Sequence, residues 1–560
     1  MAEGVLRPSG SFKDKLEKII KTSRIENKNT SKLSHTIPNS TVIASGSPTL
    51  YQLRPKRQEF GTMTRLTVGE KNVNKTNRTV LLVGETGAGK SGLINALVNY
   101  TMGVTFEDED WFQLVEDEKK GQAGSQTVSQ TSDVMVYEIF GFEGQTLPYS
   151  LTIIDTPGFG DTRGIEHDVN TNQRLFDLFR SEDGVHELHA IGLVMKASDN
   201  RLSDRLSYVF DSVMSLFGKN VEKNIVALIT HSNGRNPKNA LQALEAANVK
   251  CSRNQKNQPV YFLFNNCQHE DRAEEPECLK NAAQISERGM RGFTDFLERI
   301  AVRKMEKTVE VLNERINLTA SIQNLQERIE LIEIKQTEIR HTQQALKRHQ
   351  QEMKKNENFT FHVDEVYKDK EPLSRGKWGL FYAGAVCCTD CEENCHYPCT
   401  MARTPKYCEV MKRGRCTVCT NKCPPSAHVR EKWIYVAKTR RAVKTETLLK
   451  LKYESNKREG QKKLSLLENL ESEIKQLGAE KSQLLDESYQ HVVRLEQIAL
   501  NVTSLSTFVH LDFLIEKMKE RGDTGKLQKL QEMKSRENEG TRSALVYMMS
   551  KLKLAEKTDK

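Results

Sequence analysis

One stretch of eight residues, Gly84 to Ser91, constrains the fold of this 560-residue chain more than any other. It reads Gly-Glu-Thr-Gly-Ala-Gly-Lys-Ser, follows the apolar run 79–83 and leads into the helical pattern 92–98. A strand, a glycine-rich turn and a helix N-terminus in this order form a P-loop, whose backbone N–H groups surround phosphate oxygens. The sequence therefore predicts a nucleotide-binding domain with the phosphate-binding residues Gly84, Glu85, Thr86, Gly87, Ala88, Gly89, Lys90 and Ser91.

Between residue 79 and about residue 300, short apolar runs alternate with helical patterns, which is typical of a mostly parallel α/β sheet. The expected strands are 79–83, 134–140, 150–155, 190–196, 224–230 and 259–265. Ligands of such sheets bind beyond the carboxyl ends of the strands. Polar residues that directly follow a strand are therefore the candidates for binding and catalysis.

Residues for Mg²⁺ and the γ-phosphate follow from this placement. Lys90 is expected to reach the β- and γ-phosphates, and the Ser91 hydroxyl to bind Mg²⁺. Asp155 ends a buried run and suits the Mg²⁺ shell, while the N–H of Gly158 can contact the γ-phosphate. Thr127 in the loop 124–129 is the preferred switch threonine for Mg²⁺, with Thr131 or an ordinary polar loop as alternatives. The predicted catalytic residues are Lys90, Thr127 and Gly158.

The base-binding end lacks the usual Asn-Lys-x-Asp motif of guanine sites. Thr230 and His231 follow the run 225–229 instead, and Asn265 and Asn266 follow the next one. A histidine ring can stack on a purine and asparagine amides can bond to its edge, although a single histidine after a strand is more often structural.

These motifs together resemble the immunity-associated (IMAP) GTPases and the GTPase receptors of the chloroplast outer envelope, which belong with the septins to the TRAFAC class. The resemblance covers residues 79–300, about 40% of the chain. The matching motifs are the P-loop, Ser125-Gln126-Thr127, Asp155-Thr156-Pro157-Gly158-Phe159, the box from Leu193-Val194-Met195-Lys196 through Arg201-Leu202-Ser203 to Leu216-Phe217-Gly218, Thr230-His231 and Phe264-Asn265-Asn266. The resemblance implies a GTP/GDP site with Mg²⁺ and a homodimer through the G domain.

Two positions depart from the pattern. Asn233 stands where an acidic residue would bind the guanine N1/N2 edge, which weakens the case for guanine specificity. Phe159-Gly160 stands where other GTPases carry a water-positioning glutamine, so slow intrinsic hydrolysis is expected.

The N-terminal part of the chain is more basic than the rest. Up to Arg78 the chain has 15 Lys and Arg against 6 Asp and Glu, an excess equal to the net charge of +9 of the whole protein. Residues 1–70 are therefore expected to form a basic, largely disordered arm, in which 11–25 could alternatively form an amphipathic helix on an anionic surface. No apolar run reaches the ~20 residues of a membrane span, and a cytoplasmic location is expected.

Beyond residue 300 the apolar residues keep a spacing of three and four. One seam runs from Val302 to Leu346 and a second from Leu467 to Leu505, with charged residues between them. This pattern predicts two coiled-coil helices, 301–358 and 439–506, although two solvated helices packed on the G domain are an alternative. Residues 507–560 are expected to be helical and charged.

Nine of the twelve cysteines fall between residues 387 and 423, within the insert 359–438. Two Cys-x₂-Cys pairs with further Cys and His nearby are typical of zinc sites, and the number of donors suits two ions. The candidate ligands are Cys388, Cys391, Cys395, His396, Cys399, Cys408, Cys416, Cys419, Cys423 and His428. Flanking β-like runs, 359–367 and 432–438, could pair, and the module is expected at the tip of an antiparallel helical hairpin.

The fold class is accordingly a P-loop GTPase domain, 71–300, with a coiled-coil hairpin that carries a zinc module. The function expected first is that of a slow GTPase, regulated by dimerisation, whose arm binds protein partners. A GTP-binding scaffold that does not hydrolyse GTP shares every motif. A zinc-dependent nucleic-acid or ubiquitin-pathway factor with a regulatory G domain is the third possibility. Its weak support is the presence of basic residues beside aromatic ones in the insert, namely Lys412, Arg413 and Arg415 with Tyr397 and Tyr407.

Overall fold

A computed structural model describes most of the chain. The described residues are 36–60, 63–115, 133–158, 165–199, 204–273, 275–348, 360–373, 384–399, 402, 404–445, 466–501 and 505–535. They form two compact units, one from residues 36–213 and 220–305 and the other from residues 214–219 and 306–535.

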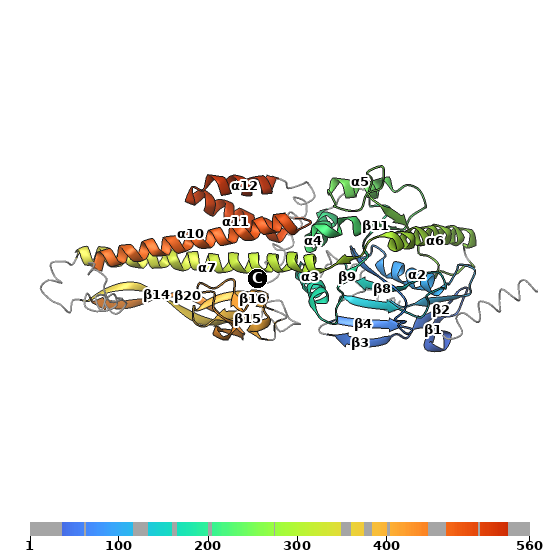
Figure 1. Ribbon diagram of the computed structural model, residues 1–560, viewed down its shortest axis with the longest axis horizontal. Coiled ribbons are helices and arrows are strands. Elements are labelled where there is room, and N and C mark those ends of the chain that lie inside the picture. Colours follow the sequence, from blue (N-terminus) through green and yellow to red (C-terminus); the bar gives the residue numbers. More distant parts are fainter. Residues whose placement is uncertain are drawn as a thin grey trace, which may run out of the picture. The chain divides into compact units, whose positions relative to one another are not determined.

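The first unit is built on an eight-stranded sheet in the order β12-β11-β10-β5-β8-β7-β4-β3 (Figure 1). Its strands are β3 (Lys56–Phe60), β4 (Met63–Val68), β5 (Asn77–Gly84), β7 (Met135–Ile139), β8 (Ser150–Asp155), β10 (Ala190–Lys196), β11 (Ile225–Thr230) and β12 (Tyr261–Leu263). All neighbouring strands are parallel except the pairs β3–β4 and β7–β8. The predicted mostly parallel sheet is confirmed, and each of the six expected strands is present.

Helices follow the strands of this sheet, because parallel neighbours require crossover connections. They are α2 (Lys90–Met102), α3 (Ile165–Arg180), α4 (Asp204–Leu216), η2 (Lys219–Asn224), α5 (Lys238–Ala246) and α6 (Pro276–Arg299). Every residue of β8 and β11 is buried, as expected of strands covered on both faces. Leu93, Ile94 and Leu97 of α2 join Val80 and Leu82 of β5 in one core. Burial of these side chains fixes the P-loop between its strand and its helix.

Residues 40–68 differ from the expected disordered arm. They form β1 (Ser40–Ala44) and β2 (Thr49–Leu53), preceded by η1 (Ile37–Asn39), and the sheet strands β3 and β4. β2 also pairs with β6 (Asp110–Gln113), and β9 (Glu187–Leu188) pairs with β13 (Arg303–Lys304). These strands are mostly polar, but a few apolar side chains in them are buried and anchor them. Examples are Leu53, Phe60 and Met63. The segment 11–25 lies outside the described residues.

The second unit contains two long antiparallel helices, α7 (Glu306–Arg348) and α10 (Leu466–Ile498). Their direction follows from the ion pairs Glu314–His491, at 3.1 Å, and Arg328–Glu480. Two shorter helices, α11 (Leu505–Arg521) and α12 (Thr524–Ser535), pack into the same apolar core. The members of this core are Val311, Leu318, Ile322, Leu325, Ile329, Leu485, Tyr489, Val492, Leu495, Ala499, Leu511, Leu514, Met518, Leu530 and Met533. The two seams thus pack against each other, and α11 and α12 cover part of them.

A long β-ribbon connects these helices to the cysteine-rich module (Figure 1). β14 (Thr360–Pro372) pairs with β20 (Trp433–Thr445) in antiparallel register from Thr360↔Thr445 to Pro372↔Trp433. The ribbon follows α7, since the N–H of Val366 donates to Glu338 at 3.1 Å. The predicted pairing of the two flanking runs is present, and it is longer than expected on both strands.

The cysteine-rich module contains short strands and turns. They are β15 (Gly384–Cys388), β16 (Glu393–Cys399), η3 (Pro405–Tyr407), β17 (Met411–Lys412), β18 (Arg415–Cys416), η4 (Pro425–Ala427) and β19 (His428–Glu431). The Thr417 hydroxyl donates to Asn317 at 2.9 Å, and the Asn324 amide donates to the carbonyl of Asn394 at 3.1 Å. The module therefore lies beside the middle of α7.

The expected position at the tip of the helical hairpin was wrong. A strand of 13 residues spans about 40 Å at about 3.3 Å per residue, and the ribbon carries the module that distance back along α7. The expectation rested on a compact insert, and the two strands are too long for one.

Candidate functional site

The P-loop connects the end of β5 to the start of α2. Gly87 and Gly89 have φ values of 79° and 89°, in the left-handed region that glycine adopts without strain. Gly89 is the N-cap of α2, so the free N–H groups of the first helical turn and the positive end of the helix dipole face the loop. This is the backbone arrangement that binds phosphate.

Lys90 lies inside the loop and is 7% exposed. Its ammonium group donates to the carbonyl oxygens of Gly84 and Glu85, both at 3.0 Å. Burial lowers the pKa of Lys90, and the carboxylates of Asp155 and Glu85 act in the opposite direction. A buried cation in contact with two neutral carbonyl groups gains stabilisation from an anionic ligand.

Asp155 and Gly158 approach the P-loop from β8. Asp155 is fully buried at the end of β8, where it lies opposite Leu82 of β5. The Thr156 hydroxyl donates to the Leu82 carbonyl at 3.0 Å, which ties the turn after β8 to the P-loop strand. A Cβ on Gly158 would lie 2.6 Å from the backbone N and Cα of Thr86, so the close approach requires glycine.

Thr230 and His231 contact the P-loop from the end of β11. The Thr230 hydroxyl lies 2.6 Å from the Ala88 carbonyl and 3.2 Å from the Met195 carbonyl. Because both neighbours are acceptors, the hydroxyl proton is used, and Nδ1 of His231, at 3.1 Å, is the donor to Thr230 Oγ1. Thr230 therefore positions the P-loop rather than pointing away from it.

The ring of His231 lies beside Gly89, where a Cβ would approach its Cε1 to 3.3 Å. Desolvation, followed by the charge of Lys196, lowers the pKa of His231. The ring is consequently neutral at pH 7 and offers a flat surface next to the P-loop.

Asn265 and Asn266 follow β12 and are held by a serine of α6. The Ser286 hydroxyl accepts from the backbone N–H of Asn265 at 2.9 Å and donates to Asn266 Oδ1 at 3.0 Å. Asn265 Oδ1 accepts from the Cys267 thiol at 3.2 Å. Asn233 stands where an acidic residue would bind the guanine edge. Its Oδ1 accepts from the N–H of Arg235 at 3.1 Å.

The structure adds two residues that the sequence did not indicate. Ser286 orders the asparagines, and Arg205 of α4 lies 3.9 Å from the carboxylate of Glu85 in the P-loop. Burial raises the pKa of Glu85, and Arg205 opposes that effect. Both residues come from amphipathic helices, where their polar side chains look like ordinary exposed positions. The switch candidates Thr127 and Thr131, with Phe159 and Gly160, lie outside the described residues.

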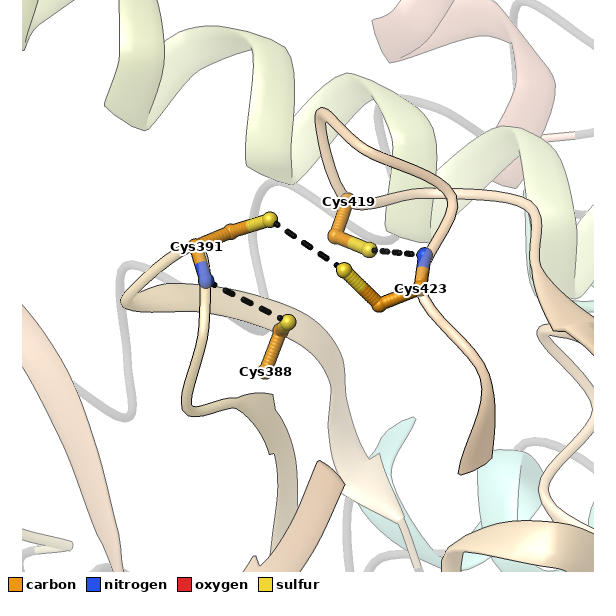
Figure 2. A group of neighbouring side chains, drawn as sticks. All are labelled: Cys388, Cys391, Cys419 and Cys423. Atoms are coloured by element: carbon orange, nitrogen blue, oxygen red, sulfur yellow. Dashed lines mark hydrogen bonds between the residues drawn. The ribbon is translucent and has the colours of Figure 1, made fainter. Parts of the chain in front are cut away.

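A second candidate site lies in the cysteine-rich module, where metal-binding atoms gather in three groups. In each group the atoms lie within 4.8 Å of one another. The four-cysteine cluster consists of Cys388, Cys391, Cys419 and Cys423. Their sulfurs converge from the end of β15 with the turn that follows it and from the loop of Cys419 and Cys423 (Figure 2). The Sγ atoms of Cys391 and Cys423 are 3.7 Å apart.

The His428 cluster consists of Cys395, Cys416, Cys419 and His428, and therefore shares Cys419 with the first. The Glu409 cluster consists of His396, Cys399, Cys408 and Glu409. Glu409 is not among the ligands that the sequence predicts, because the zinc pattern there consists of Cys and His alone. All ten expected donors occur in the three clusters, and Cys387, which was not expected to bind metal, belongs to none of them in the described residues.

The fold and the first site define a class of protein: a P-loop G domain with a mostly parallel sheet and its phosphate site at the carboxyl ends of the strands. Residues 78–288 match the sequence model of the AIG1 family. This match covers the P-loop and the motifs that follow β8, β11 and β12, in agreement with the resemblance found in the sequence. A search of curated proteins finds no match.

Solved structures with a detectable likeness include Toc33 from Arabidopsis thaliana. A dimerization-deficient Toc33 mutant shows 18% identity and a TM-score of 0.28 over 41% of this chain and 88% of that one. Toc33 in complex with GDP and Mg²⁺ shows 20% identity and a TM-score of 0.27 over the same shares. Elongation factor SelB from Methanococcus maripaludis shows 11% identity and a TM-score of 0.23 over 40% and 35%. Scores this low support no inference about this chain.

No helix in the described part of the chain is both long and apolar enough to cross a membrane.

Proposed function

We propose that residues 71–300 bind GTP with Mg²⁺ and hydrolyse it slowly, and that residues 301–506 form a coiled-coil and zinc-binding arm that binds protein partners. The observation that carries this proposal is the P-loop of an AIG1-family G domain, with Lys90 and Asp155 buried beside each other at one edge of the sheet. The residue ranges given above for the G domain, the two coiled-coil helices, the zinc-binding insert and the C-terminal region are part of this proposal.

In the proposed complex the phosphates lie at the N-terminus of α2, against the N–H groups of residues 84–91. Lys90 exchanges two neutral carbonyl acceptors for the charged β- and γ-phosphates, which is a stronger interaction. Ser91, Asp155 and Thr127 are the proposed residues for Mg²⁺, which neutralises phosphate charge when bound. The N–H of Gly158 contacts the γ-phosphate. The turn after β8 therefore makes this contact with GTP and loses it with GDP.

The base is proposed to lie between His231 and the asparagines. His231 is neutral and lies beside Gly89, which places its ring close to the phosphate loop. Asn265 and Asn266 follow the neighbouring strand and are ordered by Ser286. A stacked purine with its edge toward the two amides fits this arrangement, and the family supports guanine.

Slow turnover follows from the residues after Gly158. Phe159 and Gly160 cannot orient a water molecule as a glutamine does, and unassisted GTPases turn over at about 10⁻⁴–10⁻² s⁻¹. We propose that a second copy, bound across the nucleotide face, supplies the missing group. The homodimer is thus the active form.

The arm is proposed to be an antiparallel coiled coil, 301–358 with 439–506, that carries a zinc-binding insert, 359–438. The antiparallel pair α7–α10 and the three Cys/His clusters support it. Its exposed charged faces, together with the helices of 507–560, are the proposed partner surface.

Isothermal titration of the full chain with GTP and with ATP tests the nucleotide assignment. GTP is expected to bind at least tenfold more tightly, about 1.4 kcal/mol. Lys90→Ala is expected to abolish binding, whereas Lys223→Ala, an exposed lysine before β11, leaves the affinity unchanged. A tenfold preference for ATP would overturn the base assignment.

The rate of GTP hydrolysis per molecule, measured against protein concentration, separates the proposal from a scaffold that does not hydrolyse GTP. The specific rate is expected to rise as the dimer forms. A fast rate that does not change on dilution contradicts the dimer mechanism, and no turnover at any concentration favours the scaffold.

A further inference from the structure

The three clusters together contain eleven residues, because Cys419 belongs both to the four-cysteine cluster and to the His428 cluster. We propose that the module binds three zinc ions, two of them bridged by the Cys419 thiolate and the third held by the Glu409 cluster. This inference rests on the proposal that the module binds zinc, and it replaces the expected two separate ions.

The distances between the candidate ligand atoms fit tetrahedral zinc. With Zn–S bonds of about 2.3 Å and Zn–N bonds of about 2.0 Å, two sulfurs lie about 3.8 Å apart and a nitrogen lies about 3.5 Å from a sulfur. The observed separations are 3.7 Å for Cys391–Cys423, 4.0 Å for Cys399–Cys408 and 3.2 Å from His396 Nδ1 to Cys408 Sγ. A disulfide needs about 2.05 Å between sulfurs, and all twelve cysteines are free.

His428 gives the sharpest single indication of a metal. Its Nδ1 lies 2.9 Å from the Pro424 carbonyl and must be the protonated nitrogen, because a carbonyl only accepts. In the neutral ring Nε2 then carries the lone pair, and this atom is buried with no hydrogen-bond partner among the described residues. The sulfurs of Cys395, Cys416 and Cys419 surround it. A metal ion satisfies that lone pair, and the bond from Nδ1 fixes the ring for the purpose.

The sulfurs also receive backbone hydrogen bonds of the kind that stabilise bound thiolates. N–H groups of Cys391 and Cys423 donate to Cys388 and Cys419, at 3.4 and 3.3 Å. The N–H of Cys419 donates to Cys416 at 3.4 Å. Cys419 lies at the centre of this network, where one thiolate can contribute a lone pair to each of two ions.

The third site mixes ligand types. His396 Nδ1 lies 3.3 Å from Glu409 Oε2, and Glu409 is only 6% exposed. A buried carboxylate beside two thiols and an imidazole is costly unless a cation neutralises it. Zinc accepts carboxylate oxygen at about 2.0–2.2 Å, so the set suits this ion.

Native mass spectrometry of the reduced, full-length protein, expressed with zinc, tests the count. We expect three zinc ions per chain, two in Glu409→Gln, and three in Cys387→Ala, a matched control next to Cys388 but outside the clusters. Less than one zinc per chain overturns the zinc proposal itself. Two zinc ions in the parent protein leave that proposal standing and overturn the inference.

Replacement of zinc by NMR-active cadmium tests the bridge first in the parent protein, whose folding no substitution disturbs. We expect three resonances, of which two show scalar coupling to each other through the shared sulfur. Cys419→Ser is expected to abolish that coupling, while the third resonance persists. Three resonances without coupling overturn the bridge.

Discussion

The G domain and the cysteine-rich module reach a folded structure in different ways. The core of the G domain is a continuous apolar cluster in which strands such as β5 and β8 are buried on both faces. The core of the module consists largely of cysteine: seven of the thirteen buried residues in its cluster are Cys388, Cys395, Cys399, Cys408, Cys416, Cys419 and Cys423. Sulfur atoms thus occupy the place that aliphatic side chains hold in the G domain.

The comparison predicts a different relation between ligand and fold in each region. In the G domain the phosphate loop is ordered by neighbouring backbone, through Thr230, Thr156 and Gly158. The ligand then adds binding energy to a site that exists without it. In the module the atoms proposed to bind zinc form the core, so the free energy of metal binding is expected to be largely the free energy of folding.

Removal of zinc is expected to have the largest effect. Structural zinc sites contribute about 10–16 kcal/mol in small zinc-finger peptides, more than the stability of most domains. A zinc-selective chelator with reductant and excess Mg²⁺ should unfold residues 384–431 and release the contacts of Asn317 and Asn324 on α7. Limited proteolysis and hydrogen exchange of α7 measure this loss.

GTP affinity, measured in the same samples, is the control. It should change less than twofold, because the P-loop has its own core, and added zinc should restore the protease resistance of the module. Resistance that persists in zinc-free protein would mean that the module folds by burial of apolar side chains, as the G domain does, and that the two regions do not differ in this respect.

The same contrast explains how much the sequence could predict. Strands buried on both faces appear as apolar runs, so six strands of the sheet and the phosphate loop were placed within a few residues. β3 and β4 were missed because their buried residues are few, as with Phe60 and Met63 in a polar segment. Ser286 and Arg205 were missed because their contacts depend on tertiary structure alone.

In the module, spacing identified the cysteines and not their grouping. Cys416 and Cys419 form one Cys-x₂-Cys pair, and Cys419 belongs to two clusters while Cys416 belongs to one. Glu409 carries no signal in the sequence, because carboxylates are common in exposed loops. The position of the module beside α7 depends on the register of β14 and β20 over 13 pairs, which composition does not reveal.

A matched pair of glycine substitutions sharpens the claim that the nucleotide site is ordered by backbone packing. Gly158→Ala places a Cβ 2.6 Å from the Thr86 backbone and should displace the P-loop, weakening GTP binding at least 100-fold, about 2.7 kcal/mol. Gly92→Ala, in α2, meets only Asn266 Cβ at 3.9 Å and should leave affinity unchanged while stabilising the helix by about 0.5–1 kcal/mol. Titration calorimetry and thermal melts measure both. Equal affinities in the two variants would show that the loop adapts to its ligand.

The smallest expected effect is the response of the G domain to acid. His189 is buried, and its Nδ1 accepts from the N–H of Thr79 at 3.1 Å. Burial, followed by Arg78, lowers the pKa of His189 to about 4, from 6.5 in the unfolded chain. The unfolded state therefore binds more protons between these values, so this stabilisation is complete above pH 6.5 and is lost as the pH falls toward 4, with about 2 kcal/mol lost by about pH 5. His189→Asn, whose amide oxygen can accept the same hydrogen bond, should flatten the dependence of unfolding free energy on pH, and the exposed His186→Asn should not.

Urea unfolding followed by Trp111 fluorescence, with Trp378 and Trp433 replaced by phenylalanine, measures the slope for the G domain alone. An unchanged slope in His189→Asn would show that acid acts on this domain through other groups, and that burial of the imidazole is not what makes its core sensitive to pH.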